Sequence, residues 1–296
     1  MKLEFRNIEK SFGDKRVLCG VSFAAEGGRA FGLLGRNGAG KTTSIRIMMD
    51  VFHQDGGEVL LDGKAIEPAQ VKFGYLPEER GLYPKKKIID QLVYFAELNG
   101  MSASDAVKSV DRWLERLGMM EYRNKRLDTL SKGNQQKIQL VTALAHDPQI
   151  VILDEPFSGL DPVNAMLLKD VVREQIEKGK IVLFSSHQMS YIEEFCDSIA
   201  ILHEGRVAVT GDLYEIKRNY PRNRLFIRST ECDRILARYP GASRAAGENA
   251  LLLTMESPEK KAETMDALIK EFDVDEIKVF EPSLNDIFVE YTREGV

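Results

Sequence analysis

The sequence predicts an α/β protein, with a core built on a parallel sheet, a small antiparallel sheet, a helical insertion and a terminal α+β domain. Three short apolar runs, RAFGLLG, IVILDEP and KIVLFSSH, end in glycine or polar residues. Central strands of a parallel sheet are apolar because both of their faces are buried. Polar residues follow at their carboxyl ends, where such sheets bind ligands. Helical patterns lie between the first two runs, so these strands are expected in one parallel sheet.

The chain begins with two segments, KLEFRNIEKSFG and VLCGVSFAAEGG, that alternate apolar and polar residues and end in turn signals. Such alternation predicts a small antiparallel sheet. From about residue 87 to about residue 145 the pattern is helical, which predicts a helical subdomain inserted in the core. One of its segments, SASDAVKSVDRWLERLG, should place these apolar side chains on one helix face: Ala106, Val110, Trp113, Leu114 and Leu117.

The residue pattern changes near residues 219–223, in RNYPRN, whose Asn and Pro residues are typical of a turn or linker. From there RLFIRS, CDRILARYP, ASRAA, ALLLTME, PEKKAETMDALIKEF and DEIKVFEP read as strand, helix, strand, strand, helix and strand, followed by the short helix SLNDIFVEYT. This order is the split βαβ arrangement of ferredoxin-like domains. We expect one domain over residues 1–218 and an accessory α+β domain over residues 219–296.

Composition limits the classes of partner. Forty-one Lys and Arg against 46 Asp and Glu give a net charge of −5, with no basic tail, so no nucleic-acid partner is expected. The sequence has no signal-type start and no uncharged window of about eighteen residues, so we expect a cytoplasmic chain unless a partner holds it at a membrane. Cys19, Cys196 and Cys232 are scattered, which argues against disulfides and zinc.

A glycine loop follows the first central strand and precedes a helix. Its sequence, GRNGAGKT, fits G-x-x-x-x-G-K-[ST], which predicts a P-loop NTPase core. The glycines let backbone N–H groups surround phosphates, while Lys41 supplies charge, Thr42 a hydroxyl for Mg²⁺ and Thr43 further contacts. The residues expected to bind the phosphates are Gly35, Asn37, Gly38, Ala39, Gly40, Lys41, Thr42 and Thr43.

Two acidic residues end the strand IVILDEP. Asp154 is placed to hold Mg²⁺ through water. A second carboxylate is not needed for the metal, so Glu155 is expected to orient and deprotonate the attacking water. His187, at the end of LFSSH, should point at the same terminal phosphate from one strand further on.

The stretch LSKGNQQK predicts the N-terminus of a second helix, whose unpaired N–H groups could bind an anion. One chain would then have two anion-binding helix ends. Ser131 and the Gly133 backbone are the expected contacts at this second end.

Taken in order, these motifs resemble those of ABC-type ATPases, the nucleotide-binding subunits of ATP-driven transporters, over residues 1 to about 215. GRNGAGKTT is similar to the family's phosphate loop, LSKGNQQK to its LSGGQ signature and ILDEP to its acidic strand. SGLDP, residues 158–162, resembles the loop that links two nucleotide sites, and His187 the switch histidine. Phe12 lies where the family stacks an aromatic ring on adenine.

The resemblance also implies why the chain has two anion-binding helix ends. In this family two subunits, identical or paired, associate head to tail, so the phosphate loop of one faces the signature of the other across ATP. Ser131 and Gly133 would then contact the terminal phosphate bound by the neighbour, and closure would depend on ATP. ATP and Mg²⁺ are the implied cofactors.

Three positions depart from the family pattern. Lys132 replaces the first glycine of the signature, and Asn134 replaces its glutamine. Glu78, in GYLPEER, replaces the glutamine that senses Mg²⁺ and the membrane partner, and its carboxylate can still bind a metal-bound water. The basic stretch RGLYPKKK that follows lies where the family's subunit meets the permease.

The leading hypothesis is an ATPase that drives a separate membrane permease from the inner face of the cell membrane. EPSLNDIFVEYT resembles the extension of ATPases that serve ABC-2-type exporters, so export is favoured. The alternative is a soluble ABC-type ATPase acting on ribosomes or DNA, although the second cassette or the long insertions of such relatives are not evident. A GTPase is a third reading, because NKRLD at residues 124–128 is a near match to the guanine-reading NKxD.

Overall fold

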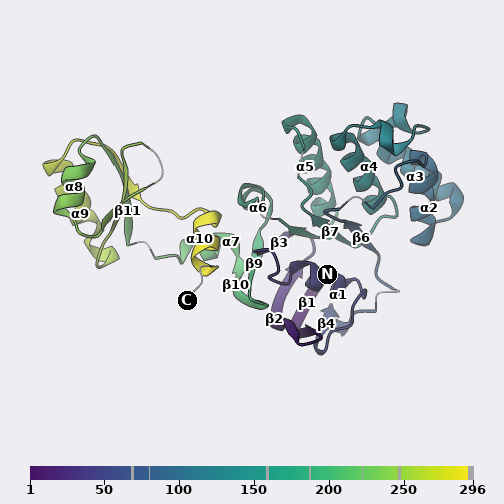
Figure 1. The fold of residues 1–296 in the computed structure, drawn as a ribbon, viewed down its shortest axis with the longest axis horizontal. Coiled ribbons are helices and arrows are strands. Elements are labelled where there is room, and N and C mark those ends of the chain that lie inside the picture. Colours follow the sequence, from purple (N-terminus) through teal and green to yellow (C-terminus); the bar gives the residue numbers. More distant parts are fainter. Residues whose placement is uncertain are drawn as a thin grey trace. The chain divides into compact units, whose positions relative to one another are not determined.

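The computed structural model describes residues 1–67, 70–79, 81–157, 160–186, 188–221, 223–245 and 248–292. The chain forms two compact units, one comprising Met1–Leu213 and the chain from Phe288 on, the other Tyr214–Ile287 (Figure 1). The first unit therefore ends a few residues before the expected boundary at residue 218, and the proposed domain limits stay a prediction. No helix in the described part of the chain has both the length and the apolar character needed to cross a bilayer.

The core of the first unit is a six-stranded sheet of order β10-β9-β3-β8-β7-β6, parallel except for the antiparallel edge strand β10. Every residue of β3, β7 and β8 is buried, which explains their uninterrupted apolar sequences. The strands are β3 Ala30–Gly35, β6 Phe73–Leu76, β7 Ile150–Asp154, β8 Ile181–Ser185, β9 Ser198–His203 and β10 Arg206–Asp212. The helices α1 Lys41–Met48, α5 Pro162–Glu177 and α6 Met189–Phe195 connect them, and α7 Leu213–Arg218 begins at the end of this stretch and continues into the second unit.

A second sheet in this unit is antiparallel, as predicted, with the order β2-β1-β4-β5. Its inward-facing side chains join those of the core sheet in one cluster, in which the rings of Phe5, Phe23 and Phe31 stack in sequence. The strands are β1 Lys2–Phe12, β2 Lys15–Glu26, β4 Gly56–Leu61 and β5 Lys64–Ala65. Side chains of α1, among them Ile45 and Met48, belong to the same cluster.

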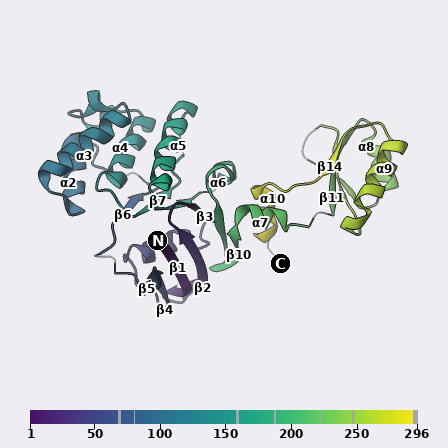
Figure 2. The same cartoon turned by 180° about the vertical axis from the view of Figure 1, so that it is seen from behind.

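The predicted helical insertion consists of α2 Ile88–Leu98, α3 Ala103–Arg116, the short 3₁₀ helices η1 Met120–Tyr122 and η2 Leu127–Thr129, and α4 Lys132–Leu144. Ser102 begins α3 by accepting a hydrogen bond from the Asp105 backbone N–H, and the predicted apolar face from Ala106 to Leu117 is buried. Figures 1 and 2 show these helices gathered beyond β6 and β7, away from the antiparallel sheet.

The second unit has the ferredoxin-like architecture that the sequence predicts. Its strands lie in the order β12-β13-β11-β14, and every neighbouring pair is antiparallel. Helices α8 and α9 pack on one face, where Leu225, Ile227 and Leu251 are fully buried. The elements are β11 Arg224–Ser229, α8 Cys232–Arg238, β12 Ala242–Arg244, β13 Ala250–Thr254, η3 Pro258–Lys260, α9 Lys261–Glu271 and β14 Val274–Val279. The final helix, α10 Leu284–Tyr291, follows them, and the division between the two units falls within it, after Ile287.

Candidate functional site

The glycine loop joins β3 to α1 and carries Lys41 as the first residue of the helix. The Lys41 ammonium donates hydrogen bonds to the carbonyl oxygens of Gly35, at 2.6 Å, and Arg36, at 3.3 Å. The loop thereby curls around the lysine, and no side chain caps α1. The unpaired backbone N–H groups and the positive end of the helix dipole face the loop, which is the arrangement that binds phosphate.

Glycine is required at two positions of this loop for different reasons. Gly40 has φ of 109°, and a Cβ there would come within 2.5 Å of Leu18 Cδ2. Gly38 has φ of 82°, but a Cβ there would meet no atom within 4 Å. Gly40 therefore serves the packing of the loop against β2, whereas Gly38 serves its left-handed backbone.

The two acidic residues lie at the carboxyl end of β7, and each side chain is 6% exposed. Glu155 has a left-handed backbone with φ of 49°, which is uncommon for a residue with a side chain. Its N–H donates to the Ser185 carbonyl at 2.8 Å, and its carboxylate accepts a hydrogen bond from Ser186 Oγ at 2.9 Å. The turn thus directs Glu155 across the end of β8.

The charges at this edge of the sheet are coupled. Burial lowers the pKa of the Lys41 ammonium, and the carboxylates of Asp154, Glu155 and Glu78 act against that decrease. Burial raises the pKa of Asp154, and the charges of Glu78 and Glu155 raise it further, while Ser185 and Lys41 lower it. Lys41 and the acidic strand therefore belong to one site, and exposed Glu78 lies near enough to act on both.

This site suits Mg²⁺ held partly by water. Three carboxylates act on one ammonium, so the site carries an excess of negative charge. No group of three His, Cys, Asp or Glu side chains among the described residues is close enough together to hold a metal ion by itself. Mg²⁺ retains several waters and takes one or two carboxylates together with substrate phosphates, so Asp154 and the Thr42 hydroxyl are suitable contributors.

The signature stretch forms the predicted helix end. Ser131 is the N-cap of α4, and its Oγ accepts a hydrogen bond from the Asn134 N–H at 3.4 Å. The Gln135 amide donates to the carbonyls of Leu127 and Leu130, which fixes the preceding turn.

The same stretch packs closely against the core. A Cβ at Gly133 would lie 3.1 Å from the Asn164 amide nitrogen of α5, so glycine allows the two helices to approach. Gln136 donates to the Pro156 carbonyl at 3.4 Å, which ties α4 to the turn that follows Glu155.

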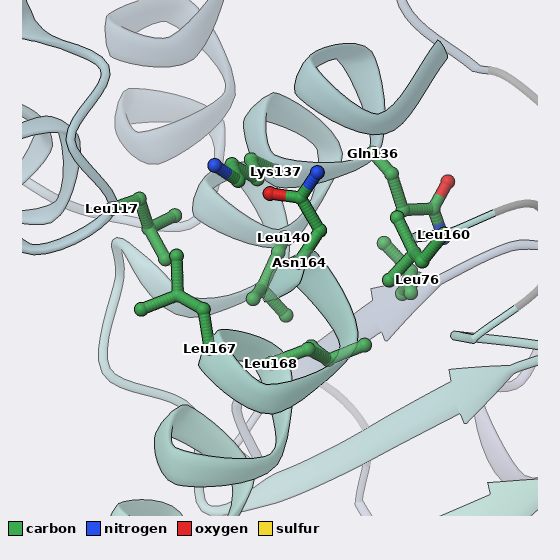
Figure 3. Close-up of a pocket in the computed structure, with 9 residues that line it drawn as sticks. All are labelled: Leu76, Leu117, Gln136, Lys137, Leu140, Leu160, Asn164, Leu167 and Leu168. Atoms are coloured by element: carbon green, nitrogen blue, oxygen red, sulfur yellow. The ribbon is translucent and has the colours of Figure 1, made fainter. Parts of the chain in front are cut away.

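A small apolar pocket lies between α4, α5 and the ends of α3 and β6 (Figure 3). Leucine side chains form most of it, and Gln136, Lys137 and Asn164 line the rest. None of the phosphate-loop residues or the acidic pair lines this pocket. It is therefore a gap between the helical insertion and the core, separate from the phosphate loop and the acidic pair.

Phe12 lies within the described part of the chain, whereas His187 does not. Phe12 is 43% exposed at the end of β1, with its ring edge-on to Phe52 at a centroid distance of 5.3 Å, so one surface is open for stacking. His187 and the Ser158–Gly159 part of the SGLDP loop lie outside the described residues.

Sequence reasoning missed Tyr75 and Ser186, which contact the two acidic residues. Their only signal in the sequence is their place near the ends of strands.

A family model for ABC transporters matches residues 18–158, and one for the C-terminal domain of DrrA1-3-like ATP-binding proteins matches residues 211–292. The uncharacterized ABC transporter ATP-binding protein YhaQ of Bacillus subtilis is 41% identical over 290 residues, 97% of each chain. Nod factor export ATP-binding protein I of Burkholderia lata is 35% identical over 213 residues, 71% of this chain and 70% of that relative.

A solved structure of the ATP-binding subunit of an ABC transporter has the same fold, with a TM-score of 0.68 and 31% identity over 74% of this chain and 93% of that chain. These similarities do not favour the ribosome-directed, DNA-directed or GTPase alternatives. Membership of the ABC transporter family is consistent with the three motifs found in this chain, which are the phosphate loop, the acidic strand and the signature helix. The chain therefore belongs to the ABC transporter ATP-binding proteins and is the ATP-hydrolysing subunit of such a transporter.

Proposed function

We propose that two copies of this chain, or this chain and a paired subunit, associate head to tail around Mg-ATP and drive a separate ABC-2-type permease that exports its solute. The subunit would lie in the cytoplasm on the inner face of the membrane, held there by the permease. Support for export comes from the EPSLNDIFVEYT segment, from the match to a DrrA1-3-like C-terminal domain and from the similarity to a Nod factor export protein.

The observation that carries the paired arrangement is the placement of the two helix ends. Helix α1, which begins at the phosphate loop, packs on β2 and β3. Helix α4, which begins at the signature, packs on β6 and on α2 and α3. The two anion-binding ends therefore belong to different parts of the first unit, and a second subunit would bring a signature to this phosphate loop.

Each residue then has a role that follows from its surroundings. Lys41 would exchange its bonds to the loop carbonyls for bonds to the outer phosphates, which are stronger acceptors because they are charged. Phe12 would stack on adenine with its exposed face. When bound, Mg²⁺ would neutralise charge on the phosphates, and Thr42 and Asp154, together with Glu78 through water, would hold it.

Glu155 would act as the general base. Its carboxylate is buried, fixed by Ser186 and set at the strand end by the left-handed turn, so it is directed before the nucleotide binds. His187 would contact the terminal phosphate from the next strand, as the resemblance implies. Ser131 and the Gly133 N–H of the partner would complete the enclosure of that phosphate.

The test is the Glu155→Gln variant, which preserves the shape of the site and removes the base. Hydrolysis should slow by roughly 10² to 10⁴-fold while ATP still binds. Uncleaved ATP should then hold two chains together, and ADP should not. Size-exclusion chromatography with ATP, with ADP and without nucleotide measures this, and a monomer under all three conditions, with ATP shown to be bound, would contradict the paired mechanism.

Ser131→Ala in the Glu155→Gln background should weaken the ATP-dependent dimer without weakening ATP binding to the monomer. The matched control is Ser102→Ala, because Ser102 is likewise the serine N-cap of a helix in the same insertion. Loss of the N-cap should weaken a helix in both variants. A dimer that is weaker with Ser131→Ala than with Ser102→Ala would therefore indicate a direct contact of Ser131 with the partner's nucleotide.

A further inference from the structure

Tyr75 lies beside the acidic strand although it is far from it in sequence. Strand β6 is the neighbour of β7 in the sheet, with Tyr75 in register with Ile152. The Tyr75 hydroxyl donates a hydrogen bond to Asp154 Oδ2 at a distance of 3.5 Å. The distance is at the long end of the range for such a bond.

Asp154 has a particular need for such a donor. Its side chain is 6% exposed, and the negative charges of Glu78 and Glu155 act on it. Ser185, the residue in register with Asp154 on β8, is fully buried, and its hydroxyl acts on the Asp154 carboxylate by lowering its pKa. The phenol of Tyr75 is a second donor, on the opposite neighbouring strand, and it contacts Oδ2 of this carboxylate.

The Tyr75 side chain is suited to this task. A phenol ordinarily keeps its proton at neutral pH, so the Tyr75 hydroxyl can act as a donor. A protonated phenol can donate to a carboxylate without adding charge to a site that already has three carboxylates. The ring is anchored in β6, so the donor position is set by the sheet.

We propose that Tyr75 is a positioning residue for the metal site, whose phenol holds Oδ2 of Asp154 so that Oδ1 stays available to the shell of Mg²⁺. This inference rests on the proposed role of Asp154. Groups that orient a metal-binding carboxylate typically change metal affinity by 10 to 100-fold when they are removed. A hydroxyl that only contributes to packing would change stability instead.

The experiment compares ATP binding with and without metal in the Glu155→Gln background, where ATP persists. Calorimetry gives the dissociation constant of ATP in EDTA and in Mg²⁺, and the EDTA value divided by the Mg²⁺ value is the ratio that measures the contribution of the metal. Tyr75→Phe should reduce this ratio by about tenfold and leave the EDTA value unchanged. The matched control is Tyr239→Phe, which removes a phenol from an equally half-buried ring in the second unit, against Phe272.

Asp154→Asn separates the inference from the proposed function. If Asp154→Asn leaves the ratio unchanged, the assignment of Asp154 to the metal is wrong. If Asp154→Asn lowers the ratio and Tyr75→Phe does not, Tyr75 has no positioning role.

The variant Tyr75→Leu separates the loss of the hydroxyl from the loss of packing, because it removes the aromatic ring as well. Tyr75→Leu should lower the ratio as much as Tyr75→Phe does, even if Tyr75→Leu unfolds at a lower temperature. A ratio that falls in proportion to stability across the two variants would overturn the proposal.

Discussion

Lys41 stabilises the phosphate loop and is the side chain that we propose binds the outer phosphates. Its ammonium holds two carbonyl oxygens of the loop, and burial lowers its pKa against the opposing effect of nearby carboxylates. Lys41→Ala should remove a charge-assisted contact worth about 1.5–3 kcal/mol, so ATP affinity should fall at least several-fold. Calorimetry with Lys64→Ala, an exposed lysine on β5, as the control measures this; equal affinities would refute the assignment.

Gly40 and Gly38 offer a matched comparison within the phosphate loop. Alanine at either position has a strained left-handed backbone, but only at Gly40 does the new methyl group meet Leu18. Gly40→Ala should therefore destabilise the fold by about 1–3 kcal/mol more than Gly38→Ala does. Urea unfolding of the two variants without nucleotide measures the difference, and equal losses would show that Leu18 moves aside at no cost.

At the scale of elements, α4 is tied to the sheet at both of its ends. Near its start Gln136 reaches the turn after Glu155, and just beyond its end His146 Nε2 lies 2.8 Å from the Phe73 carbonyl oxygen of β6. His146 is 3% exposed, and its Nδ1 has no hydrogen-bond partner among the described residues. The neutral ring therefore donates from Nε2, and the signature helix is coupled to the strand that carries Tyr75.

This coupling should depend on pH. Burial lowers the pKa of His146 below the ordinary value of an imidazole, so the unfolded chain takes up a proton at a higher pH than the folded chain does. The stability that His146 contributes is fully present above that ordinary pKa and is lost as the pH falls through it. His146→Gln keeps a donor for the Phe73 carbonyl but does not titrate.

The prediction is that lowering the pH from about 7.5 to about 5.5 reduces the stability of the wild type more than that of His146→Gln, because the buried imidazole takes up a proton on unfolding. Thermal unfolding at a series of pH values measures it. The control is His53→Gln, which removes an exposed imidazole instead of a buried one. Parallel curves for wild type and His146→Gln would contradict the prediction.

At the scale of the whole molecule, the nucleotide motifs and the ferredoxin-like unit are separate in the chain. Every described residue assigned to ATP lies in the first unit. A chain that ends at residue 219 should therefore bind ATP with the same dissociation constant as the full chain. It also loses the last residues of the first unit, from Phe288 on, so its melting temperature can fall without a change in affinity.

Calorimetry of the truncated chain measures the affinity, with circular dichroism to verify that it is folded. A folded truncated chain that does not bind ATP would show that the second unit takes part in the nucleotide site.

The sequence by itself determined the features that depend on local order. The glycine loop, the acidic strand and the signature helix end are contiguous motifs, and their backbone geometry follows from glycine, lysine and capping serine at fixed spacing. The ferredoxin-like order could also be predicted, because each of its elements has its own apolar periodicity.

Only the tertiary structure decided which distant side chains meet. Tyr75 reaches Asp154, and Ser186 reaches Glu155, because β6, β7 and β8 pair in a particular register that no local pattern encodes. The left-handed backbone of Glu155 and the buried His146 contact also depend on neighbouring strands and helices. Strand register is set by the packing of the entire sheet, so the supporting groups of the site become visible only once the fold is formed.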